Sequence, residues 1–230
     1  MQTSHGIICI RFTGKEYEFL MVKRRTSYAF TNFVLGKYNT KSEVRKYLSE
    51  MTVEEKSLII YGNFDVLYYT AFMVSKLEIK DIGLLHFYEK CKKKFEGFYS
   101  QSLIKSLCTG TSFISHTWDF PKGRPDVEES SLQVAIREFE EETSYNSSNY
   151  KLFDKKDPLI LEFKTDTNYK YILYFAYTDK IISSSFRVSN EISEIAWFSA
   201  NKAKYFLRPE FKPYIKKIIN SAKKLKKELV

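Results

Sequence analysis

Two apolar runs near the start of the chain, residues 6–12 and 18–23, are rich in β-branched side chains and flank a short Thr-Gly-Lys turn. This pattern predicts the two strands of a hairpin. From about residue 41 to residue 107 the apolar positions recur at helical spacing instead. Within that region, Thr52 followed by Glu55 fits a capping box at the start of a helix.

Strand-like patterning then returns in four runs, residues 112–120, 159–164, 170–177 and 195–198. A last amphipathic helix is expected over residues 212–229, with Pro213 in its first turn. These elements predict an α/β domain split by a mostly helical insertion. We expect its first part over residues 1–35, the insertion over 36–108 and its second part over 109–230.

The composition narrows the class of protein. A hydrophobic share of 43% in 230 residues excludes wholesale disorder. No apolar run approaches the ~18–20 residues of a transmembrane helix, and the first residues lack a signal-peptide pattern. Three cysteines without CxxC spacing make disulfides and zinc unexpected. We therefore expect a cytoplasmic protein.

The net charge of +9 is distributed unevenly. The last thirty residues carry ten Lys or Arg against two Glu, or +8, and a smaller basic cluster spans residues 90–94. Residues 126–142 show the opposite bias, with seven acids and one arginine. The chain therefore combines an acidic segment that suits cations with basic segments that suit phosphates.

The acidic segment is the stretch that indicates chemistry. Ser130 as N-cap, with Gln133 three residues on, predicts a helix over residues 132–142. Glu138, Glu141 and Glu142 share one arc of that helix, whereas Glu140 points elsewhere. Leu132, Ala135, Ile136 and Phe139 form its apolar face. Convergent carboxylates suit Mg²⁺ or Mn²⁺ and hence a phosphate-bearing substrate, although a solvated acidic face is the simpler interpretation of the acids alone.

This stretch resembles the Nudix box, the signature of a hydrolase family. Seven residues match its pattern in register: Gly123, Glu129, Arg137, Glu138, Phe139, Glu141 and Glu142. The sequence departs from it at Ser144, where the family has Gly, and at Tyr145, where an aliphatic residue is usual. Ser144 leaves in doubt only how the helix ends, because Gly most easily adopts a positive φ.

The resemblance implies a Nudix α/β/α sandwich with a mixed sheet, and metal-dependent hydrolysis of a nucleoside diphosphate linked to another moiety. It implies that Glu138, Glu141 and Glu142 hold the metal, joined by the Gly123 carbonyl, while Glu129 and Arg137 pair structurally. The catalytic residues would be Glu142, Glu191 and Glu141, with Glu142 or Glu191 as the base, and Glu191 would also serve the metal site. Glu194 competes with Glu191 for that role, and either could be a surface acid.

Two further stretches, residues 23–30 and 118–125, resemble the mRNA-decapping Nudix enzymes of large cytoplasmic DNA viruses (the poxvirus, asfarvirus and giant-virus group). Residues 190–198 resemble the corresponding segment of the eukaryotic mRNA-decapping Nudix enzymes. The similarity spans essentially the whole chain, including the split domain. It implies cleavage of the cap pyrophosphate of capped mRNA to m7GDP and RNA with a 5′-monophosphate, in the host cytoplasm if the chain is viral.

Candidate substrate contacts follow from residue type. Lys23, Arg24 and Lys122 could orient phosphates, and Tyr28, Phe30, Phe33 or Trp118 could stack on a methylated guanine, although core roles are simpler for the aromatics. The candidates for the RNA body are Lys90, Lys92, Lys93, Lys94, Lys216, Lys217, Lys223, Lys224 and Lys227. The C-terminal lysines could equally keep a docked amphipathic helix in solution or contact a membrane surface.

Two other functions compete with decapping. One is small-molecule Nudix hydrolysis of diphosphoinositol or dinucleoside polyphosphates, for which basic residues would also serve. The other is a non-catalytic RNA-binding protein on a Nudix scaffold, against which the complete Glu138, Glu141 and Glu142 set argues. No DNA specificity and no membrane insertion are expected.

Overall fold

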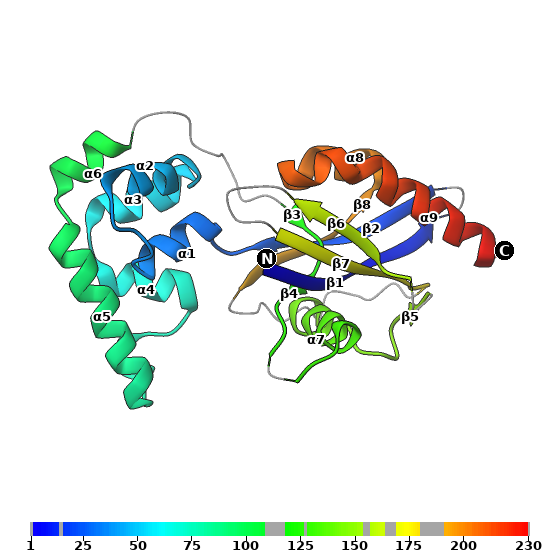
Figure 1. Ribbon diagram of the computed structural model, residues 1–230, viewed down its shortest axis with the longest axis horizontal. Coiled ribbons are helices and arrows are strands. Elements are labelled where there is room, and N and C mark those ends of the chain that lie inside the picture. The colour runs from blue at the N-terminus through cyan, green and yellow to red at the C-terminus, as the bar shows by residue number, and fades with distance from the viewer. Residues whose placement is uncertain are drawn as a thin grey trace. The chain divides into compact units, whose positions relative to one another are not determined.

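The computed structural model describes residues 2–13, 16–108, 118–126, 128–153, 157–163, 169–179 and 191–229 (Figure 1). The chain divides into two compact units, one formed by Met1–Lys23 with Thr117–Val230 and the other by Arg24–His116. The insertion was expected from residue 36, but the second unit begins at Arg24. It does so because Phe30 and Phe33 are fully buried in the core of that unit.

The second unit is helical. Its elements are α1 (Tyr28–Val34), α2 (Lys41–Ser49), α3 (Val53–Tyr61), α4 (Phe64–Phe72), the 3₁₀ helix η1 (Lys76–Glu78), α5 (Ile82–Phe98) and α6 (Gln101–Leu107). The expected capping box at Thr52 and Glu55 is present at the start of α3. Phe33, Tyr38 and Phe95 pack ring against ring in a core that is separate from the sheet. The helical unit therefore has its own hydrophobic core.

The first unit is built on a mixed sheet. Among the described residues its strands are β1 (Gln2–Thr13), β2 (Glu16–Arg24), β3 (Trp118–Asp119), β4 (Lys122–Gly123), β5 (Lys151–Leu152), β6 (Leu159–Phe163), β7 (Tyr169–Tyr177) and β8 (Ile192–Ser199). The expected hairpin is confirmed, because β1 and β2 pair antiparallel with Ile10 opposite Phe19. β1 also pairs parallel with β7, while β4 pairs antiparallel with β1 and places Gly123 opposite His5.

Helices cover both faces of this sheet (Figure 1). On one face α7 (Ser131–Thr143) buries Ala135 and Phe139 against Ile7, Cys9 and Leu20. On the other lie α8 (Ala200–Phe206), the 3₁₀ helix η2 (Pro209–Tyr214) and α9 (Ile215–Leu229), which bury apolar side chains against β1, β2, β6 and β7. The predicted α/β/α sandwich with a mixed sheet is confirmed.

Two element boundaries differ from expectation. The C-terminal helix was expected to start with Pro213 in its first turn, but Pro213 lies inside η2 and α9 starts at Ile215. Of the strand expected over residues 112–120, only Trp118 and Asp119 form β3, and residues 109–117 lie outside the described part of the chain. In the described ranges, no helix has the length and apolar character needed to cross a membrane.

Candidate active site

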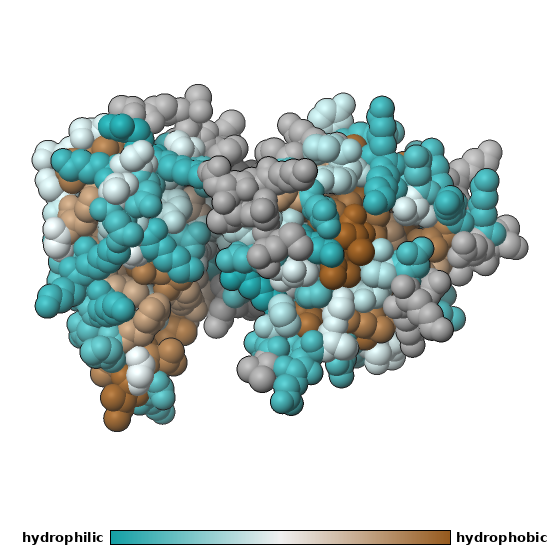
Figure 2. Space-filling view, in the orientation of Figure 1, coloured by the Kyte–Doolittle hydropathy of each residue, from teal (hydrophilic) through white to brown (hydrophobic). Residues whose placement is uncertain are grey.

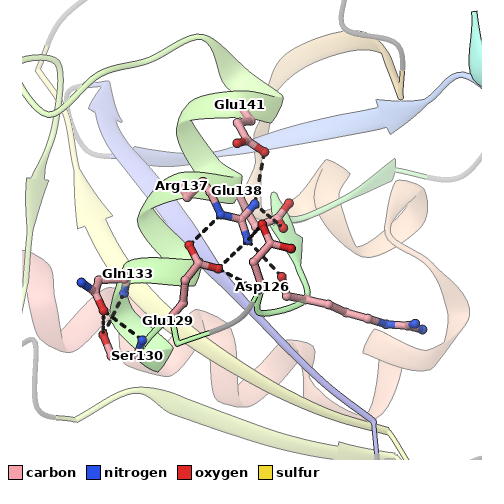
Figure 3. Close-up of polar contacts among 8 residues, drawn as sticks. Asp126, Glu129, Ser130, Gln133, Arg137, Glu138 and Glu141 are labelled. Carbon is pink, nitrogen blue, oxygen red and sulfur yellow. Dashed lines mark hydrogen bonds and ion pairs between the residues drawn. The ribbon is translucent and has the colours of Figure 1, made fainter. Parts of the chain in front are cut away.

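The acidic helix α7 begins as its sequence suggests (Figure 3). Ser130 caps its start: its hydroxyl accepts from the Gln133 N–H at 3.4 Å, and the Gln133 side chain accepts from the Ser130 N–H at 2.9 Å. The helix ends at Ser144, which adopts a left-handed conformation with φ of 59°. Serine thus occupies the position that favours glycine, so α7 keeps its length without the residue that the family pattern has there.

Arg137 and Glu129 clamp the preceding loop to α7 (Figure 3). Nε of Arg137 donates to Oε1 of Glu129, and Nη2 donates to Oε2, both at 2.8 Å. Glu129 also accepts from the Asp126 N–H at 2.9 Å, while Nη2 donates to the Arg124 carbonyl at 3.0 Å. The paired guanidinium lowers the pKa of Glu129 to about 2. The expected pair is therefore present, and it joins the loop to the helix.

Glu138 lies directly against the backbone of Gly123. A Cβ atom at Gly123 would be only 2.0 Å from Cδ of Glu138, so any larger residue would displace this carboxylate. Burial raises the pKa of Glu138, and the negative charges of Glu141 and Glu191 act in the same direction, against the opposing effect of Arg137. Burial and the neighbouring acids thus disfavour the charged form of Glu138. A bound cation would offset this unfavourable effect.

Arg137 also contacts the acids on its own helix. Its Nη1 atom lies 2.9 Å from Oε1 of Glu138 and 3.2 Å from Oε2 of Glu141. Glu141 is largely exposed, whereas Glu138 is mostly covered. Arg137 therefore offsets part of the negative charge of these two acids.

Glu142 is the most buried of the three acids, with 9% of its surface exposed. Its Oε2 atom accepts from the Lys122 N–H at 2.9 Å, which ties the end of α7 to β4. The Lys122 side chain does not fit its expected phosphate role. It is buried, lies 2.5 Å from Asp119 and stands over the Tyr171 ring, so it is committed to an internal ion pair.

Asp119 was not singled out in the sequence, although it anchors this loop. It also contacts Arg208 at 3.4 Å, and Arg208 in turn pairs with Glu210. The acid three residues before Lys122 in the Asp-Phe-Pro-Lys run could have indicated the pairing. The long-range partner Arg208 leaves no local signal.

Glu191 and Glu194 separate into two roles. The charge of Glu191 raises the pKa of Glu138, which places Glu191 in the electrostatic environment of the α7 acids. Glu194 instead pairs with Lys23 at 2.8 Å, and the Ser193 hydroxyl donates to the Lys23 carbonyl. Glu194 is thus paired with Lys23, whereas the charge of Glu191 acts on Glu138.

The donor set suits a hard divalent cation. Carboxylate oxygens and a backbone carbonyl are the ligands that Mg²⁺ and Mn²⁺ prefer, and the close approach at Gly123 keeps room for the Glu138 carboxylate beside that backbone. Within the described ranges, no three acidic, histidine or cysteine side chains already gather as a ready metal cluster. The residues thus fit the ion chemically, and Arg137 must share Glu138 and Glu141 with it.

The aromatic candidates for stacking on the cap differ in how far they are exposed. Phe30 is fully buried in the helical core, so it cannot stack on a ligand there, and the same holds for Phe33. Tyr28 is 43% exposed, and the Arg24 guanidinium lies 4.2 Å from its ring centre. Trp118 packs edge-on against Phe198 at 4.8 Å.

The two groups of lysines differ in their surroundings. On α5, Lys92 pairs with Asp65 at 2.9 Å and Lys94 donates to Asn39 at 3.2 Å, whereas Lys90 and Lys93 are exposed. On α9 the five candidate lysines are all exposed: Lys216, Lys217, Lys223, Lys224 and Lys227. The opposite face of α9 buries Ile218 and Ala222. The α9 lysines therefore form the more available cationic surface.

A known protein family matches the part of the chain that contains α7. The NUDIX domain family matches residues 103–221, more than half of the 230 residues. A protein of Acanthamoeba polyphaga mimivirus named "Putative mRNA-decapping protein" is 34% identical over 226 residues, covering 83% of this chain and 61% of that protein. The chain thus spans about three-fifths of that relative's length.

Two further proteins extend the comparison. The mRNA-decapping protein g5R of African swine fever virus (isolate Warthog/Namibia/Wart80/1980) is 28% identical, with 86% of this chain and 84% of that protein covered. The crystal structure of a Caenorhabditis elegans Ap4A hydrolase binary complex aligns with a TM-score of 0.50 and 12% identity, covering 96% of this chain and 98% of that one. That likeness shows the fold alone. Together with the Nudix box on α7, the family match establishes that this chain belongs to the Nudix family of hydrolases.

Proposed function

We propose that this chain is an mRNA-decapping hydrolase that cleaves the cap pyrophosphate of capped RNA to m7GDP and RNA with a 5′-monophosphate. The observation that carries the catalytic part is the placement of Glu138 against Gly123, within the influence of Glu141 and Glu191. The decapping names of the mimivirus and African swine fever virus relatives support the choice of substrate.

Glu138, Glu141 and Glu142, with the Gly123 carbonyl and Glu191, would hold Mg²⁺ or Mn²⁺. When bound, the cation would offset the charge of the pyrophosphate and increase the acidity of a bound water molecule. Arg137 supports this role through the clamp with Glu129, because the clamp holds the loop that follows Gly123 against α7.

A carboxylate of this chain would take the proton from the attacking water. Glu142 is our first candidate, since the Lys122 N–H holds one of its oxygens at 2.9 Å and thereby orients the group. Glu191 is the alternative. The water oxygen forms a bond to one phosphorus of the cap pyrophosphate, the bond to the bridging oxygen breaks, and that oxygen leaves with the phosphate of the other product.

The RNA body would bind on the basic surfaces rather than among the acids. The exposed lysines of α9, and Lys90 and Lys93 of α5, offer cationic surface for RNA phosphates. This arrangement supports RNA over a small substrate, because an inositol or dinucleoside polyphosphate does not need a basic surface along a fifteen-residue helix.

The test compares three substrates in the presence of Mg²⁺ or Mn²⁺: cap-labelled RNA, free cap dinucleotide and a diphosphoinositol polyphosphate. The proposal expects turnover of capped RNA with much weaker turnover of the free cap. Turnover of the inositol compound alone would contradict it in favour of a small-molecule hydrolase. No turnover of any substrate, with RNA binding retained, would indicate a non-catalytic RNA-binding protein.

A further inference from the structure

Helix α8 carries an aromatic and cationic surface that the site described above does not use. Tyr205 is 84% exposed and Phe206 is 45% exposed, values unusual for two adjacent aromatic residues in a folded unit. Lys202 is also exposed and precedes them by three and four residues. Residues at this spacing share one face of a helix, so Lys202 lies between the two rings.

The exposed rings continue into a row of aromatic side chains on the same unit. Phe206 contacts Phe198 with ring centres 5.0 Å apart, and Phe198 contacts Trp118 at 4.8 Å. The buried side of α8 is anchored by Ala203, which has no exposed surface. The backbone of β8 leads directly into α8, with Ser199 capping the helix. The helix that carries Tyr205 and Phe206 is therefore anchored to the rest of the unit through Ala203 and Phe206.

Strand β8 connects this surface to Glu191. Glu191 immediately precedes β8 and α8 immediately follows it, so the strand separates them by roughly 25 Å at about 3.3 Å per residue. A nucleic acid strand leaving the acids along β8 needs several nucleotides to reach α8. In Figure 1, α8 and α9 lie on the same face of the sheet, opposite α7.

We propose that Lys202, Tyr205 and Phe206 form a platform for the body of single-stranded RNA, on which unpaired bases stack while Lys202 contacts a phosphate. Aromatic rings beside cationic side chains are the chemistry that binds single strands without sequence preference. An apolar protein partner fits less well, because two lysines, Lys202 and Lys204, lie on the same short helix as the rings. This inference rests on the proposed function for the identity of its ligand.

The experiment measures the affinity of the full chain for uncapped, mixed-sequence, single-stranded RNA by fluorescence anisotropy over a range of salt concentrations. Tyr205→Leu removes the ring but keeps an apolar side chain. It should weaken binding about fivefold to a hundredfold, as expected for loss of one stacked base. Tyr205→Phe should retain wild-type affinity. Neither variant should change the slope of log affinity against log salt, because neither changes charge.

Two further measurements test the phosphate contact of Lys202 and the need for unstacked bases. Lys202→Ala should lower that slope by about 0.7, the value for one bound phosphate of a single strand. Duplex RNA should bind wild type and Tyr205→Leu equally, because its bases are already stacked. Tyr61→Leu is the matched control, since Tyr61 is 81% exposed but belongs to the helical unit. Thermal unfolding of each variant checks that the fold is kept.

Unchanged affinity of Tyr205→Leu for single-stranded RNA would overturn the inference, and so would an equal loss with Tyr61→Leu or with duplex RNA. Because the RNA is uncapped and no turnover is measured, the result does not depend on decapping. Loss of stacking with no cap cleavage would retain the platform and reject the proposed function. Cap cleavage with no effect at Tyr205 would do the reverse.

Discussion

At the scale of single residues, Arg137 organises the acidic segment. It contacts Glu129, Glu138 and Glu141, and its ion pair with Glu129 joins the loop to α7. Two of the other acids that it touches, Glu138 and Glu141, are among those we assign to the cation. Arg137 therefore has two effects: it holds the loop that follows Gly123, and it limits the repulsion among the acids before a cation binds.

The first prediction concerns Glu142. Glu142→Gln should lower kcat on capped RNA by about 10²–10⁴-fold, because the amide can neither accept the proton nor serve as a charged ligand. Folding and RNA affinity should be kept, since the amide oxygen can still accept from the Lys122 N–H. Single-turnover cleavage and anisotropy give the two readouts.

Glu140→Gln is the matched control for this substitution. Glu140 lies on the same helix, and its side chain accepts from the Tyr150 hydroxyl at 3.2 Å, a bond that an amide oxygen can keep. Its activity should stay near wild type. Wild-type activity in Glu142→Gln would contradict the role of Glu142 at the site. A partial loss in Glu142→Gln with complete loss in Glu191→Gln would assign the base to Glu191. Retained activity in both would contradict the site.

The second prediction uses the lowered pKa of Glu129, about 2 against an ordinary value of 4.5. An acid with a lowered pKa in the folded state stabilises it above the unfolded pKa, and this contribution is lost as the pH falls. Wild type should therefore be more stable than Glu129→Gln at pH 7. The difference should shrink as the pH falls from about 4.5 towards 2.

Denaturant unfolding of the two proteins at several pH values measures this difference. Glu128→Gln, which removes the same charge at the preceding residue, is the control for net charge. A difference between wild type and Glu129→Gln that stays constant from pH 7 to pH 3 would show that the ion pair does not stabilise the fold.

At the scale of elements, those that depend on neighbouring residues were predictable from the sequence, whereas pairings between distant residues were not. The start of α7 was predictable because Ser130 and Gln133 satisfy each other within one turn, and its buried face because Ala135 and Phe139 recur at helical spacing. The hairpin of β1 and β2 was also predictable from local signals, because two apolar runs rich in β-branched residues flank a short turn. The pairing of β1 with β7 was not, because it joins residues about 165 positions apart, such as Ile8 and Phe175.

Side-chain roles were less predictable than elements. Lys122 looked like a phosphate ligand because it adjoins Gly123, but its burial depends on Asp119 and on Tyr171 from β7. Phe30 was a stacking candidate because it is aromatic, with a core role as the simpler expectation, and α1 places it in the helical core. In both cases the deciding partners are distant in the sequence or belong to a core that the pattern did not reveal.

The third prediction belongs to α9. Replacing Lys216, Lys217, Lys223 and Lys224 by Ala should weaken binding of single-stranded RNA. It should also lower the slope of log affinity against log salt by about 0.7 for each phosphate that these lysines bind in the wild type. The buried face, with Ile218 and Ala222, is unchanged, so the fold should persist. Anisotropy titrations at several salt concentrations give both quantities.

The control removes the same number of charges from exposed lysines that are scattered over other elements: Lys41, Lys80, Lys105 and Lys151. This variant has the same net charge as the α9 variant. If the two lose affinity equally, net charge alone explains RNA binding. If the α9 variant keeps both affinity and salt slope, the lysines of α9 do not contact RNA.

At the scale of the whole molecule, the separation of charge decides how the chain can handle a polyanion. In our proposal, the acids of α7 would repel RNA until a cation binds, whereas the exposed lysines of α9 and the proposed platform on α8 would attract it. The helical unit also exposes apolar side chains near the start of α5: Leu77, Ile82, Leu84 and Phe87. Figure 2 shows hydrophobic surface at the lower end of this unit, where Figure 1 places the start of α5.

The central claim is that the acids of α7 direct hydrolysis of the cap pyrophosphate. The most direct measurement is identification of the products released from cap-labelled RNA by wild type and by Glu142→Gln, with Mg²⁺ or Mn²⁺ present and after its removal by chelation. The account predicts m7GDP and RNA with a 5′-monophosphate from wild type with the cation, and neither product in the other cases. Release of m7GMP with a 5′-diphosphate RNA, or of m7GDP by Glu142→Gln at the wild-type rate, would contradict it.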